Sequence, residues 1–344
     1  MKRARGPDLG SLHSGTRRPR KPPLRTSANG EKRAFDILSK RLDNVATVRP
    51  CEPYFPRAGG ILSESDVLIH SKELSPLQTG ELIHLPRQDA QWEWMSFFVR
   101  RLQPGDVFCT HTEKEEAAFV LLGGTCLADW GQGNTRIGKR KNVFDGFPYV
   151  LYLPDRCKVN FAAETMCEIA ECRVPSEARL EARLVTPKDV GSNIRGGGNV
   201  SRQIVDAITP AFPADRLIVI EVYTPGGNWS SYPPHKHDVH NPPAEVDLDE
   251  IYYYRIRQPG GFAFQHLYSG DKSSERTLKT RDGDAVLVRS GYHPVVAGPG
   301  YDVYYLNFLA GSSRTLAVTE DAQHVWIRST WKEQDPRLPL VRES

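Results

Sequence analysis

The chain has 344 residues, 39% of them hydrophobic and 25% charged, which are ordinary proportions for a soluble globular protein with room for two domains. No apolar run approaches the roughly 20 residues that span a bilayer, and the basic first residues precede no apolar core of the signal-peptide kind. The six cysteines form no CxxC pair, so we expect reduced thiols rather than a disulfide framework. The sequence therefore predicts a cytoplasmic protein with no membrane partner.

The net charge of +3 is unevenly distributed, because residues 1–41 carry twelve Lys or Arg against three acids, a net +9, which leaves −6 on the remainder. A mildly acidic body is not the charge pattern of a nucleic-acid enzyme, so nucleic acid is not expected as a partner. The segment up to about residue 45 is rich in Arg, Lys, Pro, Gly and Ser and cannot bury enough apolar surface to offset its ordering entropy. We predict a disordered basic extension over residues 1–55. The cluster at residues 17–21 is interpreted as part of that solvated tail, with an address or an anion-binding patch as the alternative.

Residues 56–190 have the pattern of a first β module. Short apolar runs alternate with turn-forming residues, and regularly spaced short strands of this kind predict an antiparallel sandwich or barrel. The expected strands include Met95–Val99, Ala117–Leu122, Tyr149–Leu153 and Lys158–Ala162. No GxGxxG or Walker sequence occurs, which leaves nucleotide binding without support.

Residues 191–325 repeat this rhythm after a Gly-rich crossing at Ser192–Gly198, where we place the domain junction. A short helix is expected over Asn199–Ala207. Strands are expected at Leu217–Thr224, Glu250–Ile256, Gly261–Ser269, Asp284–Arg289 and Asp302–Phe308. Two similar modules in tandem indicate an internal duplication. Residues 326–344 are assigned to a C-terminal tail, and Trp326 and Trp331 predict that it packs back on a sheet.

Two histidines occupy alternate positions in the segment PPHKHD at residues 233–238. Alternate side chains of an extended strand share a face, so His235 and His237 are expected to point the same way. Glu250 opens a following aromatic strand, and His293 follows a glycine turn. Three imidazoles and a carboxylate can surround a divalent cation, so the sequence predicts a metal site at these four residues.

The order of these motifs resembles the cupin superfamily, whose small jelly-roll barrels hold a metal ion on three histidines and a glutamate. The chain departs from the pattern in the longer insertion between His237 and Glu250, and in Arg289, where a proline commonly precedes the glycine turn. The insertion leaves the carboxylate open among Glu245, Asp247, Asp249 and Glu250. We select Glu250 because a strand gives a rigid geometry, whereas Glu245 lies among prolines in a loop.

A closer resemblance is to the 5-deoxy-glucuronate isomerase family of myo-inositol breakdown, which is related to the isomerase of 5-keto-4-deoxyuronate. The segments that carry it are residues 233–238, 250–255 (EIYYYR), 261–265 (GFAFQ), 291–295 (GYHPV) and 299–307 (PGYDVYYLN). RGGG at residues 195–198, with Arg202 beyond it, resembles the inter-domain motif of the same family. The resemblance covers roughly residues 60–325 and implies an all-β bicupin, with two tandem antiparallel jelly-roll barrels over residues 56–190 and 191–325.

The resemblance also implies the activity, namely a metal-dependent aldose–ketose isomerase that converts 5-deoxy-glucuronate to 5-dehydro-2-deoxy-gluconate. It implies one divalent metal ion per chain on His235, His237, Glu250 and His293; Zn²⁺ and Mn²⁺ suit the chemistry, and Fe²⁺ is compatible with the same ligands. The first barrel offers only His111 and Glu113, without HxH, and is expected to be structural and free of metal. The expected partner is a small sugar-acid substrate, and a homo-oligomer is compatible with the sequence.

Candidates for the remaining roles follow from position and chemistry. Alternation places Tyr252 and Tyr254 on the face of Glu250, and we select Tyr254 and Gln265 as catalytic residues that handle the substrate hydroxyls. A substrate carboxylate requires an arginine fork, for which we select Arg195, Arg202 and Arg255, with Arg289 also available. Two other functions would use the same ligands: an iron-dependent cupin dioxygenase, and a sugar-acid binding module without turnover. Open coordination positions at the metal favour catalysis over binding alone.

Overall fold

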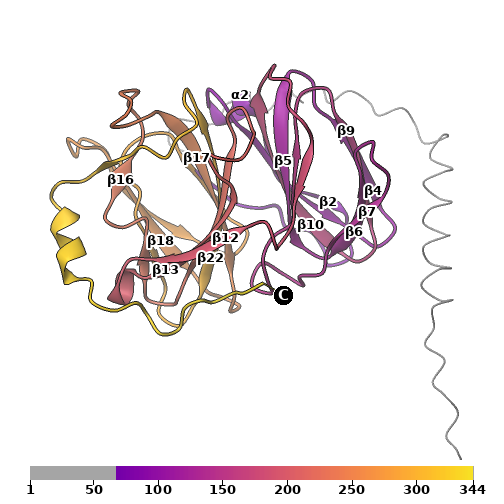
Figure 1. The fold of residues 1–344 in the computed structure, drawn as a ribbon. Helices are drawn as coiled ribbons and strands as arrows, with labels where there is room; N and C mark the ends of the chain where they lie inside the picture. The colour runs from indigo at the N-terminus through magenta and orange to yellow at the C-terminus, as the bar shows by residue number, and fades with distance from the viewer. Residues whose placement is uncertain (1–66, 344) are drawn as a thin grey trace, which may run out of the picture. The chain divides into compact units, whose positions relative to one another are not determined.

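The computed structural model describes residues 67–343 and places them in β-sheets with very little helix (Figure 1). The predicted basic extension of residues 1–55 lies outside the described residues. Within residues 67–343, every pairing between named strands is antiparallel, which confirms the predicted all-β antiparallel architecture. The same residues contain no helix long and apolar enough to cross a membrane.

The first barrel consists of a six-stranded sheet and a four-stranded sheet. The strand order is β11-β8-β5-β10-β3-β2 in the larger sheet and β4-β9-β6-β7 in the smaller. The elements are β2 (Gly80–Leu85), α2 (Arg87–Ala90), β3 (Ser96–Leu102), β4 (Val107–His111), β5 (Glu115–Gly123), β6 (Thr125–Asp129), β7 (Thr135–Gly138), β8 (Val150–Leu153), β9 (Lys158–Ala163), β10 (Cys167–Pro175) and β11 (Arg183–Val185).

The second barrel has a seven-stranded sheet, β1-β20-β17-β22-β14-β13-β12, a four-stranded sheet, β15-β21-β18-β19, and the pair β16-β23. Its strands are β1 (Leu68–Ile69), β12 (Gly191–Arg195), β13 (Arg202–Ile208), β14 (Ile218–Thr224), β15 (Trp229–Ser230), β16 (His235–Lys236), β17 (Leu248–Ile256), β18 (Ala263–Tyr268), β19 (Glu275–Thr280), β20 (Ala285–Val288), β21 (Val295–Ala297), β22 (Val303–Gly311) and β23 (Thr319–Glu320). Two 3₁₀ turns, η2 (Gly198–Val200) and η3 (Val325–Thr330), complete it.

Four neighbouring strands occur in the same order in the two large sheets. β8, β5, β10 and β3 of the first sheet match β20, β17, β22 and β14 of the second, and both β5 and β17 have nine residues, as do β10 and β22. This correspondence supports the predicted internal duplication. The domain boundaries near residues 190 and 325 stay a prediction, because the described residues belong to one compact unit and β1 pairs with β20 of the second sheet.

The short helix expected over Asn199–Ala207 is wrong. Only Asn199 and Val200, the end of η2, form a helical turn, and the segment from Arg202 onward is the strand β13. β13 pairs with β12 on one side and β14 on the other, and its Ile204 and Val205 are buried on opposite faces. Pairing on both edges and β-branched residues therefore decide the local structure.

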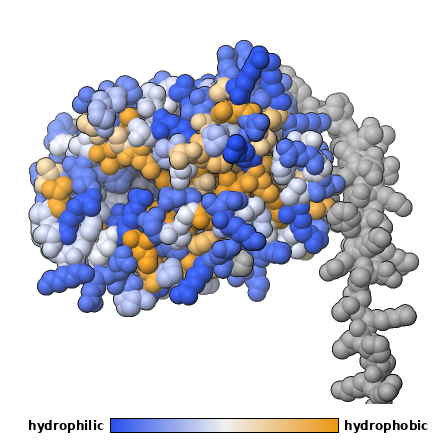
Figure 2. All heavy atoms as spheres, viewed as in Figure 1, coloured by the Kyte–Doolittle hydropathy of each residue, from blue (hydrophilic) through white to orange (hydrophobic). Residues whose placement is uncertain are grey.

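The apolar core has three parts, one inside each barrel and one between the two large sheets. Successive residues of β17 divide between them: Ile251 and Tyr253 face the first barrel, whereas Tyr252 faces the interior of the second. Phe97 of β3 packs against Tyr253 and Phe308 with ring centroids 5.9 Å apart in both pairs. Strands buried on both faces read as continuous apolar runs, which is why the segments of β17 and β22 show no polar alternation. Figure 2 shows that, on the visible face, apolar side chains gather mainly about the region where the two barrels meet.

The prediction of reduced thiols holds for Cys126, Cys157, Cys167 and Cys172, which are free. It is wrong for Cys109, which is disulfide-bonded. Spacing along the chain does not show which thiols meet in the fold, so the sequence could not identify this exception.

Candidate metal centre

Short, rigid segments bring the predicted ligands together inside the second barrel. β16 carries His235 and pairs with β23, so His237 lies one residue beyond a fixed strand. Glu250 is the third residue of β17, where it pairs with Val288 of β20 and Leu309 of β22. Pairing on both sides holds the backbone of Glu250 in place. This is the rigid strand geometry for which Glu250 was preferred over the loop residue Glu245.

His293 is positioned by the turn at Gly291. The φ of Gly291 is 81°, and a Cβ at this position would lie 2.5 Å from the carbonyl oxygen of Tyr268. Only glycine satisfies both conditions, since other residues rarely adopt this conformation and would collide with the neighbouring backbone. The glycine turn therefore sets the direction in which His293 enters the barrel.

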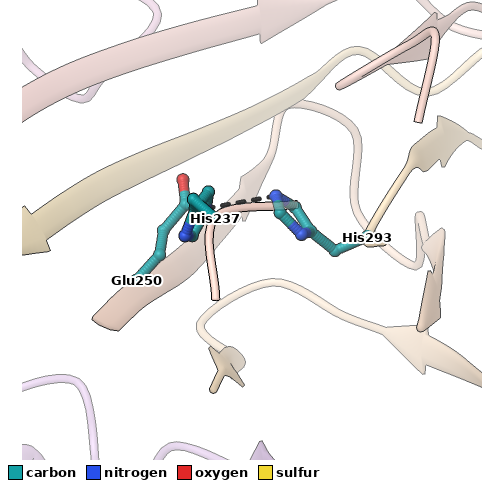
Figure 3. Close-up of side chains that lie close together, drawn as sticks. All are labelled: His237, Glu250 and His293. Carbon is teal, nitrogen blue, oxygen red and sulfur yellow. Dashed lines mark hydrogen bonds and ion pairs between the residues drawn. The ribbon is translucent and has the colours of Figure 1, made fainter. Parts of the chain in front are cut away.

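His237, Glu250 and His293 converge in the structure (Figure 3). The Nε2 atoms of His237 and His293 lie 2.9 Å and 3.3 Å from Oε2 of Glu250. The other ring nitrogens are committed to the backbone: Nδ1 of His237 donates to the Leu248 carbonyl at 3.0 Å, and Nδ1 of His293 donates to the Gly291 carbonyl at 2.9 Å. Each imidazole therefore presents Nε2 to the carboxylate, in the orientation that metal-ligating histidines have.

The three residues fit a divalent cation. Their ligand atoms lie within 4.8 Å of one another, and the side chains are almost fully buried. Nε2 of His293 has no hydrogen-bond partner, since its 3.3 Å approach to Glu250 lacks hydrogen-bond geometry. An orphaned buried nitrogen costs free energy unless it binds something, and two imidazoles with a carboxylate are a donor set that suits zinc and similar ions.

The imidazole of His235 lies beside this group and is a fourth candidate ligand. Its ring centroid is 4.8 Å from that of His293 and 6.3 Å from that of His237. Burial, together with the neighbouring His293 and His237, lowers the pKa of His235 well below its usual value. The neutral imidazole is the form that binds metal ions, so His235 is in the correct protonation state to complete the set.

The contact between Glu250 and His237 shifts the pKa of each residue. Burial alone would raise the pKa of Glu250, but the hydrogen bond from His237 and the Coulombic attraction of His237 and His293 lower it to about 2. Burial alone would lower the pKa of His237, and the hydrogen bond to Glu250 raises it. Glu250 is therefore ionised at neutral pH, as a carboxylate ligand must be.

Of the four carboxylates that the sequence left open, Glu250 is the one that reaches the imidazoles. The other three have different partners: Glu245 accepts from Lys236, Asp247 lies near His240, and Asp249 accepts the backbone N–H of Trp94. Asp249 does not reach the imidazoles because side chains alternate along β17, so that Asp249 points to the face opposite Glu250.

A cavity of about 460 Å³ opens onto three of the four candidate ligands, whereas the fully buried His293 is not part of its lining. His235, His237 and Glu250 line it, together with two phenols and three guanidinium groups, from Tyr252, Tyr305, Arg195, Arg202 and Arg328. Ser231 Oγ joins the two phenols, with contacts of 3.0 Å to Tyr252 and 3.4 Å to Tyr305. The cavity has the size of a small-molecule site and is lined by more hydrogen-bond donors than acceptors.

The other predicted residues lie outside the lining of this cavity. Tyr254 is buried beneath it and donates to Gln265 Oε1 at 2.9 Å, and Gln265 Nε2 lies 3.4 Å from the carbonyl oxygen of His293. Arg255 forms ion pairs with Glu168 and Asp282 on the opposite face of β17. The structure thus places Arg195 and Arg202 on the same cavity as three of the candidate ligands and keeps Tyr254, Gln265 and Arg255 out of its lining.

The C-terminal segment provides a wall of the cavity that the sequence patterns did not indicate. Glu320 of β23, Arg328 of η3 and Trp331 all line the cavity. The tail was expected to pack on a sheet because of its tryptophans, but nothing in their spacing indicated that they would reach a site formed about 90 residues earlier in the chain. β23 reaches it by pairing with β16, the strand of His235.

A small antiparallel barrel with histidines and a glutamate converging inside it is the arrangement that defines cupin-type metal proteins. The family model described as the KduI/IolB family matches residues 69–327, and the chain belongs to that family. Among curated relatives, the 5-deoxy-glucuronate isomerase of Geobacillus thermodenitrificans is 42% identical over 255 residues, which cover 74% of this chain and 93% of that protein. The 5-deoxy-glucuronate isomerase of Bacillus subtilis is 34% identical, with 72% and 93% covered.

Two solved structures bear on the fold. An IolB-like protein from Salmonella typhimurium has a TM-score of 0.74 and 35% identity, with 76% of this chain and 99% of that chain covered. A mutant of the oxalate decarboxylase OxdC of Bacillus subtilis has a TM-score of 0.52 at 14% identity, covering 79% and 81%. The second likeness concerns the fold alone, and it extends over both barrels.

Proposed function

We propose that the chain is a metal-dependent aldose–ketose isomerase that converts 5-deoxy-glucuronate to 5-dehydro-2-deoxy-gluconate. The observation that carries this proposal is the buried group of His237, Glu250 and His293, in which Nε2 of His293 is unpartnered and from which His237 and Glu250 face a cavity lined by arginines. It is supported by family membership and by relatives named 5-deoxy-glucuronate isomerase. The reaction moves a proton between adjacent carbons without net redox change.

In this proposal one divalent cation, Zn²⁺ or Mn²⁺, is held by His235, His237, Glu250 and His293. When bound, such an ion supplies Lewis-acid polarisation of the substrate carbonyl and its neighbouring hydroxyl. The backbone carbonyls that fix the Nδ1 atoms of His237 and His293 keep both Nε2 atoms directed inward, so the ligands need not reorganise.

The phenols of Tyr252 and Tyr305 are the groups on the cavity wall that can hold or pass a proton beside the ligands. Their hydroxyls meet at Ser231 Oγ, which gives Tyr252 a short relay within the protein. Tyr254 and Gln265, selected from the sequence as catalytic residues, act in this proposal as positioning residues. Their chain of contacts ends at the carbonyl of His293 and therefore supports the turn that carries this ligand.

We further propose that the protein acts in the cytoplasm, in the breakdown of inositol, on a small sugar acid. A homo-oligomer stays a prediction from the sequence. The substrate is an anion, and the three arginines of the cavity are suited to that charge.

The experiment that tests the function is proton NMR of purified protein with 5-deoxy-glucuronate in D₂O under nitrogen, with elemental analysis of the same sample. We expect the ketose to accumulate, turnover to stop on chelation, and Zn²⁺ or Mn²⁺ to restore it. Oxygen uptake by an iron-loaded protein without isomerisation under nitrogen would instead indicate a dioxygenase. A shift in melting temperature without any product would indicate a binding module.

A further inference from the structure

The hairpin of β12 and β13 places two arginines directly opposite each other. Arg195 and Arg202 are register partners in the antiparallel ladder, so their side chains leave the same face of the sheet. Directly opposed residues have Cβ atoms about 4.5–5.5 Å apart, and like charges in such positions destabilise a sheet. Both side chains line the cavity of the metal centre. A pair of this kind is stabilised when an anion lies between the two guanidinium groups.

The turn of this hairpin fixes the guanidinium of Arg202. Gly196 has a φ of 85°, and a Cβ at this position would lie 2.2 Å from the Val200 carbonyl oxygen and 3.1 Å from Arg202 Nη1. Nη1 donates to the carbonyl oxygens of Val200 at 3.3 Å and Tyr232 at 3.2 Å. None of the carboxylates within residues 67–343 forms an ion pair with Arg202. The backbone therefore orients this cation but leaves its charge unneutralised.

The C-terminal segment completes the surroundings of the hairpin. A Cβ on Gly197 would lie 2.6 Å from Cβ of Trp331, so the indole rests directly on the turn. The guanidinium carbon of Arg328 lies 5.1 Å from the Trp331 ring centroid, and Arg328 forms an ion pair with Glu320. The indole Nε1 of Trp331 is buried and has no acceptor. This wall therefore adds a third cation and an unused neutral donor.

The charges of the cavity do not balance. Arg195, Arg202 and Arg328 contribute three positive charges, but Arg328 is paired with Glu320 and the exposed Arg195 is attracted by Asp206, so Arg202 is the cation without a carboxylate partner. Burial, with further repulsion from Arg195 and Arg328, lowers the pKa of Arg202, as expected for a cation without a nearby anion. Glu250 would offset only one of the two positive charges of a divalent cation on the candidate ligands. With that ion bound, the cavity would therefore be strongly positive.

We propose that Arg195 and Arg202 form a clamp for the carboxylate of the sugar-acid substrate, closed by Arg328 and Trp331 of the C-terminal segment. This inference rests on the proposed function for the identity of the acid. The clamp selects acids over neutral aldoses, because a neutral ligand would leave the opposed guanidinium groups uncompensated. Arg202 is the principal contact, since it is oriented by the backbone and has no carboxylate partner, whereas Arg328 already has Glu320.

The test removes the negative charge of the substrate and the positive charge of the arginine, separately and together, and compares the kinetics. Steady-state kinetics are measured for 5-deoxy-glucuronate and for its C6 amide, which is identical in shape and uncharged. For Arg202→Gln we expect kcat/KM for the acid to fall roughly 10- to 100-fold, mainly through KM, because charge-assisted hydrogen bonds are lost. The amide should lose much less, so that the preference for the acid disappears. Arg202→Lys should recover part of the preference, and Arg328→Gln should have a smaller effect.

The matched control is Arg281→Gln, at an exposed arginine on the same barrel that does not line the cavity. It should leave both substrates unaffected, and metal content should be unchanged in every variant. Equal losses for the acid and the amide in Arg202→Gln would overturn the clamp while leaving the proposed function intact. Failure of the unmodified protein to turn over the acid would instead overturn the proposed function. In that case calorimetry with gluconate decides: at least tenfold weaker binding in Arg202→Gln supports the clamp, and unchanged binding refutes it.

Discussion

The two barrels place different residues at the same structural position. Ala117, the third residue of β5, pairs with Leu153, the last residue of β8. Glu250, the third residue of β17, pairs with Val288, the last residue of β20. The sheet registers therefore equate Ala117 with Glu250. The first barrel lacks a carboxylate at the position where the second has one, and both strands otherwise occupy the same place in their sheets.

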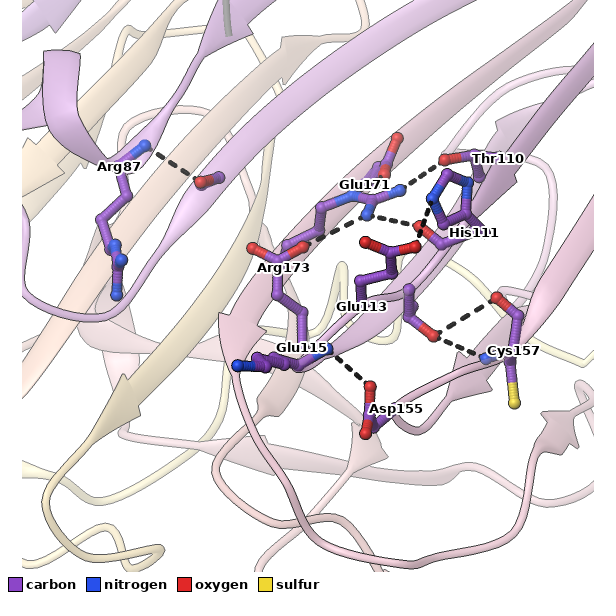
Figure 4. A network of polar contacts seen from close by, with 12 residues as sticks. Arg87, Thr110, His111, Glu113, Glu115, Asp155, Cys157, Glu171 and Arg173 are labelled. Carbon is purple, nitrogen blue, oxygen red and sulfur yellow. Dashed lines mark hydrogen bonds and ion pairs between the residues drawn. The ribbon is translucent and has the colours of Figure 1, made fainter. Parts of the chain in front are cut away.

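The polar groups inside the barrels also differ in how they are satisfied. In the first barrel, Arg100 and Arg173 form ion pairs with the fully buried Glu171. Arg173 also reaches Glu115 and the His111 carbonyl (Figure 4). In the second barrel, the imidazole Nε2 of His293 and the charge of Arg202 lack partners, as does the neutral indole of Trp331; an unpartnered indole also occurs in the first barrel, at Trp130. A closed network stabilises a fold, whereas buried groups with unused capacity indicate a ligand.

The largest effect is expected from His293→Ala. Losing this ligand should remove the metal and lower kcat by roughly 10³-fold or more, because charge stabilisation by the ion is lost. Circular dichroism should retain the β-signature. The matched variant is His111→Ala in the first barrel, which should keep both metal and turnover. Full activity of His293→Ala in metal-depleted protein would contradict the assignment of the site.

The next largest effect concerns stability in the first barrel. Glu171→Gln leaves Arg100 and Arg173 without their shared carboxylate in a buried position. Breaking such a network typically costs about 3–5 kcal/mol of unfolding free energy. Urea unfolding should show this loss, while metal content and turnover per folded chain stay unchanged. Glu113→Gln, whose side chain is 77% exposed, should change stability little. A loss of metal in Glu171→Gln would show that the two barrels are not functionally separate.

The same carboxylate should make stability depend on pH. Burial would raise the pKa of Glu171, but Arg100 and Arg173 outweigh it and hold the pKa below the ordinary 4.5. The folded state then releases this proton more readily than the unfolded state. The stabilisation is complete above about pH 4.5 and is lost as the pH falls through the folded-state pKa. The free energy of unfolding, measured from pH 7 to pH 3, should decline less steeply in Glu171→Gln. Parallel curves for the two proteins would contradict this origin of acid sensitivity.

The smallest effect is expected from deleting residues 1–45. This segment precedes the region that matches the family model, which begins at residue 69. Turnover and melting temperature should therefore equal those of the full chain. A large loss of either would mean that the basic extension takes part in folding or assembly.

The sequence predicted that His237, Glu250 and His293 lie close together, because strand periodicity and turn chemistry are local properties. Each of three motifs restricts the direction of a side chain: HxH, a glutamate that opens a strand, and a glycine turn. Together these motifs indicated the side chains that lie close together in the structure. The same periodicity also assigns Arg255 to the opposite face of β17 from Glu250, as the ion pair with Glu168 reflects.

The sequence could not predict how deep in the barrel each inward-pointing side chain lies. Tyr252 and Tyr254 share the face of Glu250, but each step of two residues advances a strand by about 7 Å. Tyr252 therefore lies at the level of the cavity, and Tyr254 lies beneath it. Arg328 and Trp331 were missed for a different reason, since they reach the cavity through the long-range pairing of β23 with β16.

The most direct measurement is anomalous X-ray scattering at the metal edge from crystals of the purified protein. We expect one peak per chain, inside the second barrel, about 2.0–2.2 Å from imidazole nitrogens of His235, His237 and His293 and a carboxylate oxygen of Glu250. A peak inside the first barrel, or none at these four residues in an active sample, would contradict this expectation.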